Sequence, residues 1–595
     1  MADVMLAGQI TRLRQRRTAP LILELDLTQG IAEGPPTDPV AALLSRHKTR
    51  LADVLDGLRR AREDSRVRAL IAKVGGQHIG LATVQELREA IGQFRAAGKP
   101  AYVWAESFGE FSRGNLPYYL ATAFDQIYLQ PSGNLGLTGI LIEQVFLRSA
   151  LDKIGVSFEA AQRQEYKTAA HPLTERGFTG PAREATEHLA TSIADQLTAA
   201  IAERRGKTPA DARALLDRGP FLPHEALAER LVDTVGYRDE VYAAVRNEAG
   251  AEAILQYVGR YQRAHTLAQR ARKLPKSRER YVAVIYATGP IRQGRSGRGP
   301  MSGPAIGSDT VAGALRAAAA DERARAILLR VNSPGGSSTA SDTIWREVVR
   351  ARTAGTPVVV SMGDVAASGG YYIAMAADEI IAQPGTITGS IGVETGKPVI
   401  ENLLGRAGIT TDAVSEGAHG RMFAPIHPFS QDEWAIVNAW LDHIYADFTG
   451  KVAAGRGMSQ EQVQEVARGR VWTGADAVNN GLADSLGGLG AAAAAARRRG
   501  GLPADAPLRL FPRVTPLDQL RPRESSEDHA AEAAAALGLP GALPALAAAL
   551  APGLLAGLGP VAETWGAWGP AWRLAAQAGL PPYGPLTMPG YWSIG

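Results

Sequence analysis

Short, almost continuous apolar runs recur in the second half of the chain, at residues 281–286, 326–331, 358–361 and 380–382. Runs of this length without a polar face are typical of strands that are buried on both sides of a parallel sheet. Between two of them, residues 341–354 show an amphipathic pattern that ends at Gly355, which predicts a helix. A shorter apolar stretch at 369–377 predicts a buried helix. Strands that alternate with helices indicate a mostly parallel α/β fold.

The chain also repeats parts of itself, in the same order and at a nearly constant separation. The matching segments are 67–74 with 324–331, 97–100 with 354–357, 118–121 with 371–374, 171–172 with 427–428 and 231–233 with 482–484. Because both order and spacing are kept, the sequence predicts a tandem duplication. The predicted parts are a basic N-terminal segment at 1–17, a first repeat at 18–250, a linker at 251–277, a second repeat at 278–500 and an Ala-, Gly- and Pro-rich tail at 501–595.

The two ends of the chain differ in composition from the repeats. Arginines cluster between residues 12 and 17, but the apolar run after them stops at Glu24, so we expect no N-terminal export signal or membrane anchor. Residues 533–562 carry no charge, yet several prolines prevent a continuous membrane-spanning helix there. The tail is either loosely packed or in peripheral contact with a membrane, helped by Trp565, Trp568 and Trp572. The compartment stays open.

Composition excludes several classes of site and partner. The 595 residues include no cysteine, which excludes a cysteine nucleophile, disulfides, a zinc–thiolate site and an iron–sulfur cluster. Hydrophobic residues make up 45% and charged residues 21%, as in a globular protein rather than a disordered one. The net charge of +4 is small and the basic residues are spread out, so we expect no nucleic-acid partner.

Residues 364–374, with the sequence DVAASGGYYIA, carry the first candidate for chemistry. The pattern predicts the end of a strand, a tight turn of small residues and the start of a helix. Ser368 at this turn has its hydroxyl at a helix N-terminus, where free N–H groups and the helix dipole favour developing negative charge. Ser368 is therefore either a nucleophile or an ordinary helix cap, and this segment alone leaves both open.

A glycine-rich segment, NSPGGS at 332–337, follows the apolar run at 326–331. In a parallel α/β fold this segment lies at the carboxyl end of its strand, which is the usual ligand edge. Its N–H groups could stabilise an oxyanion, or the segment could be a plain turn before a helix. It lacks the G-K-[ST] sequence of a P-loop.

No acid–histidine pair and no H-E-x-x-H metal motif lies near Ser368 in the sequence, and we expect no metal. Two candidates for a general base come from the first repeat. Lys167 can act as a base if burial lowers its pKa towards neutrality, although a lone lysine is ordinarily a solvated surface residue. His171 is the rival, because the pKa of histidine is suitable without any shift.

Together these segments resemble the signal peptide peptidase family called protease IV, of the long, duplicated type, over about residues 18–500. The motifs that carry the resemblance are ASGGYY at 367–372, NSPGG at 332–336, TGSIGV at 388–393 and YKTA at 166–169. The resemblance implies the ββα-superhelix fold of crotonases and Clp protease subunits. It also implies a serine peptidase with a Ser/Lys dyad that needs no cofactor, forms tetramers and digests small apolar peptides such as cleaved signal peptides.

The resemblance implies a role for each matching residue. Ser368 matches the nucleophile, Lys167 the general base and Ser390 a second serine that orients the lysine. Gly335 matches a donor to the oxyanion, and Gly369, the residue after the nucleophile, is expected to be the second donor. Peptide substrates would bind as extended strands beside the Gly335 segment, by backbone pairing. Family members usually carry an N-terminal membrane anchor, which we do not find in this sequence.

The duplication offers a test of these roles within the chain itself. Aligned by their shared motifs, the repeats differ at three such positions: Ser368 against Asn115, Ser390 against Leu137, and Phe423 against Lys167. Each repeat thus keeps the part of the dyad that the other lacks. The His-Pro pair occurs in both repeats, which favours a structural role for His171.

Two alternatives come from other functional classes. The first is an acyl-CoA enzyme on the crotonase fold, which would ordinarily need a carboxylate as its acid or base; the closest to Ser368 in sequence is Asp364. The second is a catalytically inactive scaffold in membrane quality control, which predicts a degenerate dyad, whereas both serines and the lysine are present.

Overall fold

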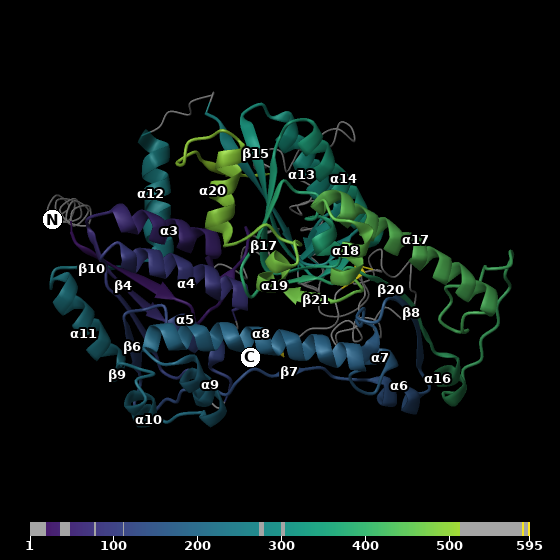
Figure 1. Cartoon of the computed structure of the whole chain (residues 1–595), viewed down its shortest axis with the longest axis horizontal. Helices are drawn as coiled ribbons and strands as arrows, with labels where there is room; N and C mark the ends of the chain where they lie inside the picture. Colours follow the sequence, from purple (N-terminus) through teal and green to yellow (C-terminus); the bar gives the residue numbers. More distant parts are fainter. Residues whose placement is uncertain are drawn as a thin grey trace, which may run out of the picture.

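The computed structural model describes residues 19–35, 48–75, 79–110, 112–272, 279–298, 304–511, 586–587 and 593–594. The predicted basic segment at 1–17 and the uncharged stretch at 533–562 lie outside these residues. We call residues 19–272 the first half and residues 279–511 the second half. The first half contains a parallel sheet and the second half a mostly parallel one, and the two sheets lie side by side in the molecule (Figure 1).

The central strands in the sheet of the first half are largely buried on both faces, as is usual in a parallel α/β fold. Its strand order is β10 (Ile254–Tyr257), β1 (Leu21–Asp26), β4 (Val67–Lys73), β5 (Ala101–Ala105), β6 (Gln126–Leu129) and β9 (Thr234–Val235), and neighbours are parallel. Leu21 and Leu23 pack towards α3 (Leu51–Glu63) and α4 (Leu81–Ala96), while Ile22 between them packs towards α11 (Arg238–Ala249). The strand alternation therefore distributes apolar side chains over two helical layers.

The sheet of the second half follows the same plan. Its order is β21 (Val471–Thr473), β19 (Ile387–Gly389), β17 (Val358–Ala367), β15 (Ala324–Ser333), β11 (Tyr281–Thr288) and β23 (Leu508–Leu510), with β18 (Glu379–Ala382) on β17 and β22 (Ser485–Leu486) on β18. Helices α13 (Ser308–Ala320) and α14 (Ser338–Thr353) cover one face, and α20 (Leu489–Arg499) covers the other. Only the β19–β21 pair in this described sheet is antiparallel.

These elements confirm the predicted α/β fold, but several differ in length from the prediction. The strand predicted at 358–361 runs on to Ala367 as β17, and the helix predicted at 341–354 begins at Ser338 because the Ser337 hydroxyl caps it. The helix predicted at 369–377 is the short α15 (Gly369–Tyr372). The predicted linker at 251–277 contains β10 and α12 (Val258–Arg272), which contacts α3. The predicted boundaries of the repeats stay predictions.

The remaining elements connect the sheets and their helices. In the first half they are β2 (Ile31–Ala32), β3 (Thr49–Arg50), α5 (Asn115–Ala121), β7 (Ile142–Glu143), α6 (Arg148–Ile154), β8 (Ser157–Arg163), α7 (His171–Thr174), α8 (Gly180–Arg205), α9 (Pro209–Arg218) and α10 (Pro223–Ala228). In the second half they are β12 (Ile291–Arg292), β13 (Gly297–Arg298), β14 (Pro304–Gly307), β16 (Gly335–Gly336), β20 (Val393–Val399), α16 (Glu401–Arg406), α17 (Gln431–Arg456), α18 (Gln460–Val466) and α19 (Gly474–Asn479). The tail contributes β24 (Leu586–Thr587) and β25 (Ser593–Ile594).

Elements of the two halves pair directly with one another. Strand β8 of the first half is antiparallel to β20 of the second along its whole length. Helix α8, which runs across the lower half of the molecule in Figure 1, places Leu189 in an apolar cluster with Ala367 and Val471 of the second half. The halves are therefore joined by backbone hydrogen bonds and by apolar packing close to Ser368.

A buried group of charges also joins the halves. The guanidinium of Arg330, which is fully buried on β15, lies 2.5 Å from the Glu33 carboxylate and 2.6 Å from that of Glu86. Nearby, the Asp364 carboxylate accepts hydrogen bonds from the backbone N–H and the hydroxyl of Thr83, at 2.9 and 2.8 Å. Removing one member of such a group would leave a buried charge without its partner, which is costly.

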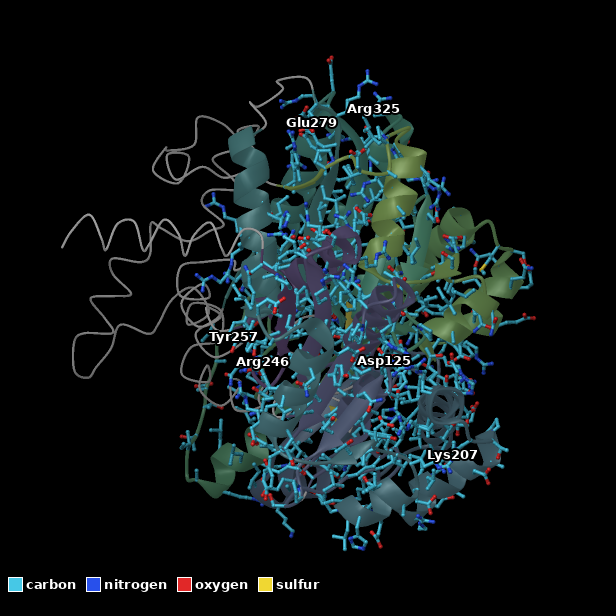
Figure 2. All side chains as sticks on the ribbon, turned by 90° about the vertical axis from the view of Figure 1, so that its left-hand side faces the viewer. Asp125, Lys207, Arg246, Tyr257, Glu279 and Arg325 are labelled. Atoms are coloured by element: carbon cyan, nitrogen blue, oxygen red, sulfur yellow. The ribbon has the colours of Figure 1, made fainter. Side chains whose placement is uncertain are left out.

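Two features concern nucleic acid and membrane as partners: the distribution of surface charge and the composition of the helices. On the face shown in Figure 2, acidic and basic side chains are interspersed; the labelled ones include Asp125, Lys207, Arg246, Glu279 and Arg325. Within the described residues, no helix has both the length and the apolar composition needed to cross a bilayer.

Candidate active site

Three side chains singled out in the sequence meet inside the protein, where the halves touch. Lys167, Ser368 and Ser390 are all fully buried. The Nζ of Lys167 lies 2.8 Å from the Oγ of Ser368 and 3.1 Å from the Oγ of Ser390. It also donates to the backbone carbonyl of Ser390 at 3.2 Å. The amine therefore has hydrogen-bond partners for every proton it can carry.

Ser368 stands between the end of β17 and the start of α15, as the sequence predicted. Its backbone has φ +55°, in the left-handed region that residues other than glycine rarely adopt. Holding the backbone there costs on the order of 1–3 kcal/mol of folding free energy. Its N–H donates to the carbonyl of Gly389 at 2.8 Å, which ties the turn to β19. The side chain makes no capping hydrogen bond to α15 and lies beside Lys167 instead. The strained turn thus aims the hydroxyl at the amine and not at the helix end.

Backbone hydrogen bonds of Tyr166 and Lys167, together with two close glycines, hold Lys167 in place. Its N–H donates to the carbonyl of Gln164 at 3.3 Å, and the neighbouring Tyr166 N–H donates to Arg468 of the second half at 3.1 Å. A Cβ on Gly469 would come within 2.6 Å of the Lys167 Cβ, and one on Gly392 within 3.2 Å of its Cδ. Only glycine at these two positions lets the backbone pack so closely against the lysine and keep water away from its stem.

Ser390 follows β19 and completes the group. It too has a left-handed backbone, with φ +51°, and its N–H donates to the carbonyl of Arg470 at 2.7 Å. Both the hydroxyl and the backbone carbonyl of Ser390 thus lie within hydrogen-bond distance of the Lys167 amine.

Burial sets the protonation of the amine. Desolvation lowers the pKa of Lys167 to about 8, and the nearby carboxylate of Glu394 acts in the opposite direction. With a pKa of about 8, roughly a tenth of the Lys167 amines are neutral at pH 7 and about half at pH 8. The lone pair of the neutral amine can then accept the Ser368 proton.

Glu394 is a member of this site that the sequence analysis did not single out. Its side chain is buried on β20, and one carboxylate oxygen accepts the N–H of Ala170 at 3.1 Å. Burial raises the pKa of Glu394 to about 7, while Lys167 lowers it. The sequence offered one signal for it: Glu394 is an acidic residue four positions after Ser390, directly after the apolar segment Ile391–Val393.

The glycines predicted to bind the oxyanion lie next to Ser368. A Cβ on Gly369 would come within 3.1 Å of both the Gly335 Cα and the Gly336 N, so the two segments touch. As the first residue of α15, Gly369 has an N–H without an acceptor inside its own helix. The Gly335 N–H donates to the Ser333 hydroxyl at 3.2 Å. The N–H groups of Gly335 and Gly369 thus lie on two touching segments, one of which begins directly after Ser368.

Sequence comparisons decide the family. The sequence model of peptidase family S49 matches residues 93–252 and 350–502, which is more than half of the chain. The chain belongs to peptidase family S49. It is 32% identical to Protease 4 of Salmonella typhi over 79% of this chain and 77% of that protein. The family assignment confirms the resemblance to protease IV, and this S49 chain is accordingly a serine peptidase.

Two further relatives agree with this assignment. The S49 chain is 30% identical to the chloroplastic serine protease SPPA of Arabidopsis thaliana, over 79% of this chain and 68% of that protein. It is 31% identical to Protease 4 of Haemophilus influenzae, over 73% and 70%. The Clp protease family model also matches residues 306–386, which span β15, α14 and β17. The fold is therefore of the ClpP/crotonase-like α/β type.

Other candidate residues of the S49 chain lie apart from the Lys167–Ser368 pair. The Nε2 of His171 lies 3.2 Å from the Gln162 side chain. The Asp364 carboxylate, which the acyl-CoA alternative would have needed, is bonded to Thr83. Asn115, the counterpart of Ser368, is buried and donates to the Gly139 carbonyl at 2.9 Å. Phe423, the counterpart of Lys167, is 68% exposed.

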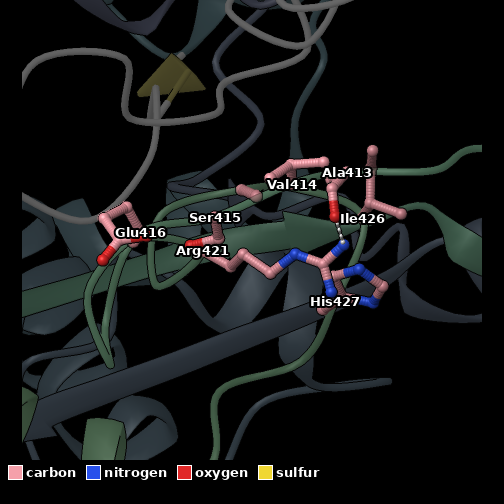
Figure 3. Close-up of a pocket in the computed structure, with 9 residues that line it drawn as sticks. Ala413, Val414, Ser415, Glu416, Arg421, Ile426 and His427 are labelled. Carbon is pink, nitrogen blue, oxygen red and sulfur yellow. Dashed lines mark hydrogen bonds between the residues drawn. The ribbon is translucent and has the colours of Figure 1, made fainter.

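A separate hollow lies in the loop after α16. It has a volume of about 350 Å³ and is lined by residues between 413 and 427, including Ser415, Glu416 and His427 (Figure 3). The Arg421 guanidinium crosses it and donates to the Ala413 carbonyl at 3.0 Å. Ser368, Ser390 and Lys167 do not line this hollow, so it is not part of the candidate active site.

Proposed function

We propose that this S49 peptidase is an endopeptidase with a Ser/Lys dyad, in which Ser368 is the nucleophile and Lys167 the general base. The observation that carries the proposal is the 2.8 Å distance between the Lys167 Nζ and the Ser368 Oγ, in a fully buried position. The lowered pKa of Lys167 supports it, because a base must be neutral before it can accept a proton.

The proposed reaction has two stages, acylation of the serine and hydrolysis of the acyl-enzyme. Neutral Lys167 takes the Ser368 proton as the hydroxyl oxygen attacks the peptide carbonyl carbon, and the N–H groups of Gly335 and Gly369 hold the resulting oxyanion. Lys167 then gives the proton to the leaving amine as the C–N bond breaks, which leaves an acyl-enzyme. A water molecule, deprotonated by Lys167, attacks the ester carbon. As the C–O bond to Ser368 breaks, Lys167 returns the proton to the Ser368 oxygen and the acid is released. Ser390 keeps the amine in place during both steps.

The proposed substrates are extended segments of small, apolar peptides such as cleaved signal peptides. Backbone pairing beside the Gly335 segment would orient them, because Gly335 and Gly336 offer a strand edge without side chains. We also propose that the protein acts as a homo-oligomer, a tetramer by its resemblance to protease IV. Light scattering of the purified chain tests the oligomer.

The dyad is tested by substitution and by active-site labelling. Ser368→Ala and Lys167→Ala should each lower kcat for a fluorogenic apolar peptide by roughly 10⁴-fold or more. Lys207→Ala, a lysine outside the site, should keep full activity. Ser390→Ala should lower kcat partially. A fluorophosphonate probe should label the wild-type chain at Ser368 and label Lys167→Ala far more slowly. Turnover by Lys167→Ala close to that of the wild type would refute the dyad.

A further inference from the structure

The guanidinium of Arg470, in the second half, contacts two residues of the first half. Its Nη2 lies 2.8 Å from one carboxylate oxygen of Glu184 on α8. The other oxygen of that carboxylate accepts a hydrogen bond from the hydroxyl of Tyr166 at 2.5 Å. The guanidinium also lies over the ring of Tyr166, with 5.1 Å between its Cζ and the ring centroid. Arg470 therefore holds, directly and through Glu184, the side chain of the residue that precedes Lys167.

The backbone at Arg470 contacts the candidate active site as well. The carbonyl of Arg470 accepts the N–H of Ser390 at 2.7 Å. The preceding residue, Gly469, packs so closely against Lys167 that a Cβ on it would lie 2.4 Å from the Lys167 nitrogen. One short segment of the second half therefore contacts both the lysine and the serine whose hydroxyl lies beside the amine.

Trp472 supports the guanidinium from the side of the second half. The centroid of its ring lies 4.4 Å from the Arg470 Cζ, and its indole N–H donates to the Val466 carbonyl at 2.8 Å. Trp472 belongs to β21, where it pairs with Thr388 of β19, and β21 also contacts α8 (Figure 1). Because the indole is fixed in this way, the guanidinium stacked on it has a defined position.

The two repeats differ at this position. With their shared Leu-x-Asp segments aligned, Arg470 corresponds to Gly219. A Cβ on Gly219 would lie 1.7 Å from the carbonyl oxygen of Leu137, so the backbone leaves no room for a side chain there. Leu137 is the residue that stands in the place of Ser390. The repeat that lacks the second serine therefore also lacks an arginine beside it.

We propose that Arg470 is a positioning residue, which fixes Lys167 and Ser390 relative to one another. It acts on Lys167 through Tyr166, and on Ser390 through its own carbonyl. This role rests on the proposed function, because it serves the same Ser/Lys dyad. A base displaced by about 1 Å from the proton that it must accept can cost on the order of 10²-fold in rate.

The exposure of the Arg470–Glu184 ion pair separates this role from a contribution to stability. The Glu184 side chain is 53% exposed, and an ion pair with such an exposed carboxylate adds little to the stability of the fold. Loss of the pair should therefore lower kcat much more than it lowers the free energy of unfolding.

Substitutions of Arg470 test the proposal. Arg470→Ala should lower kcat for an apolar peptide by on the order of 10²-fold and leave KM within about two-fold of the wild-type value. Arg470→Lys keeps a charge for Glu184 but has no plane to stack on Trp472, so kcat should recover only in part. The matched control is Arg205→Ala, which removes a less exposed arginine from the other end of α8, where it pairs with Asp233 at 2.8 Å. This control should keep the wild-type kcat.

Labelling with a fluorophosphonate distinguishes positioning from folding. The final extent of labelling counts the folded sites, and the rate of labelling per site reports how well Lys167 activates Ser368. Arg470→Ala should be labelled more slowly than the wild type but to the same final extent. A lower extent with an unchanged rate per site is the result expected of a merely structural residue, and it would overturn the proposal.

A double-mutant cycle tests whether Arg470 acts through Glu184. Glu184→Ala should also lower kcat, and the double variant should be hardly slower than Arg470→Ala alone, because both changes remove the same contact. Fully additive effects on kcat would contradict this connection. The dyad is judged separately by Lys167→Ala. If that variant loses activity while Arg470→Ala keeps the wild-type kcat, the dyad stands and Arg470 has no positioning role.

Discussion

The amine of Lys167 lies 2.8 Å from the hydroxyl of Ser368, although 201 residues separate them in the chain. One residue comes from the first half and the other from the second. Their distance therefore depends on how the halves pack, through the β8–β20 pairing and the apolar cluster around Ala367. The following predictions each disturb one physical element of this arrangement.

The protonation of Lys167 predicts how activity depends on pH. Only the neutral amine acts as a base, so kcat/KM should be low in acid and should rise as pH increases through about 8, the pKa of Lys167. The measurement is kcat/KM for an apolar peptide across this range, with circular dichroism at each pH to verify the fold. A profile that is flat or falls through this pH would contradict the assignment of Lys167 as the base.

The carboxylate of Glu394 predicts a shift of that profile. A negative charge stabilises the ammonium form and so raises the pKa of Lys167. Glu394→Gln removes the charge and keeps an oxygen for the Ala170 N–H, so the rising limb of kcat/KM should move to lower pH. Glu433→Gln, which removes a buried carboxylate that does not act on Lys167, should leave the limb in place. An unmoved limb in Glu394→Gln would show that the two groups are not coupled.

The close approach of Gly469 to Lys167 predicts a matched pair of variants. Gly469 has φ +81° and Gly457 has φ +64°, so alanine costs backbone strain at both. A Cβ at Gly469 would collide with the Lys167 backbone, whereas one at Gly457 would have no neighbour within 4 Å. Gly469→Ala should therefore lower kcat by a large factor, on the order of 10²-fold for a displaced catalytic group. Similar kcat values in both variants would mean that Lys167 tolerates the displacement.

The buried charges around Arg330 predict a stability effect that is separate from catalysis. Arg330→Ala leaves the Glu33 and Glu86 carboxylates without their partner in the interior, which should lower the free energy of unfolding by about 3–5 kcal/mol. Arg59→Ala breaks an exposed pair with Asp56 and should cost about 1 kcal/mol or less. Urea unfolding followed by fluorescence measures both. Equal effects would indicate that the Arg330 group contributes no more than a surface pair.

Much of the site was predictable because local patterns carry it. A strand, a turn of small residues and a helix start made Ser368 a candidate, and these features depend on neighbours within a few positions. The order of the motifs, together with the opposite losses in the two repeats, singled out Lys167 and Ser390. The lengths of elements were less predictable: β17 continues to Ala367 because its later residues pair with β15 and β19, which no local pattern indicates.

By itself, the sequence determined the alternation of buried strands and helices, the family and the residue types of the proposed dyad. Only the tertiary structure decided which distant groups act on them: Glu394 and Gly469 beside Lys167, and Arg470 paired with Glu184. Periodicity and motifs record contacts between residues close in the chain. The protonation of a lysine and the partner of an arginine depend on desolvation and on ion pairs between segments hundreds of residues apart, which exist only after the halves have packed together.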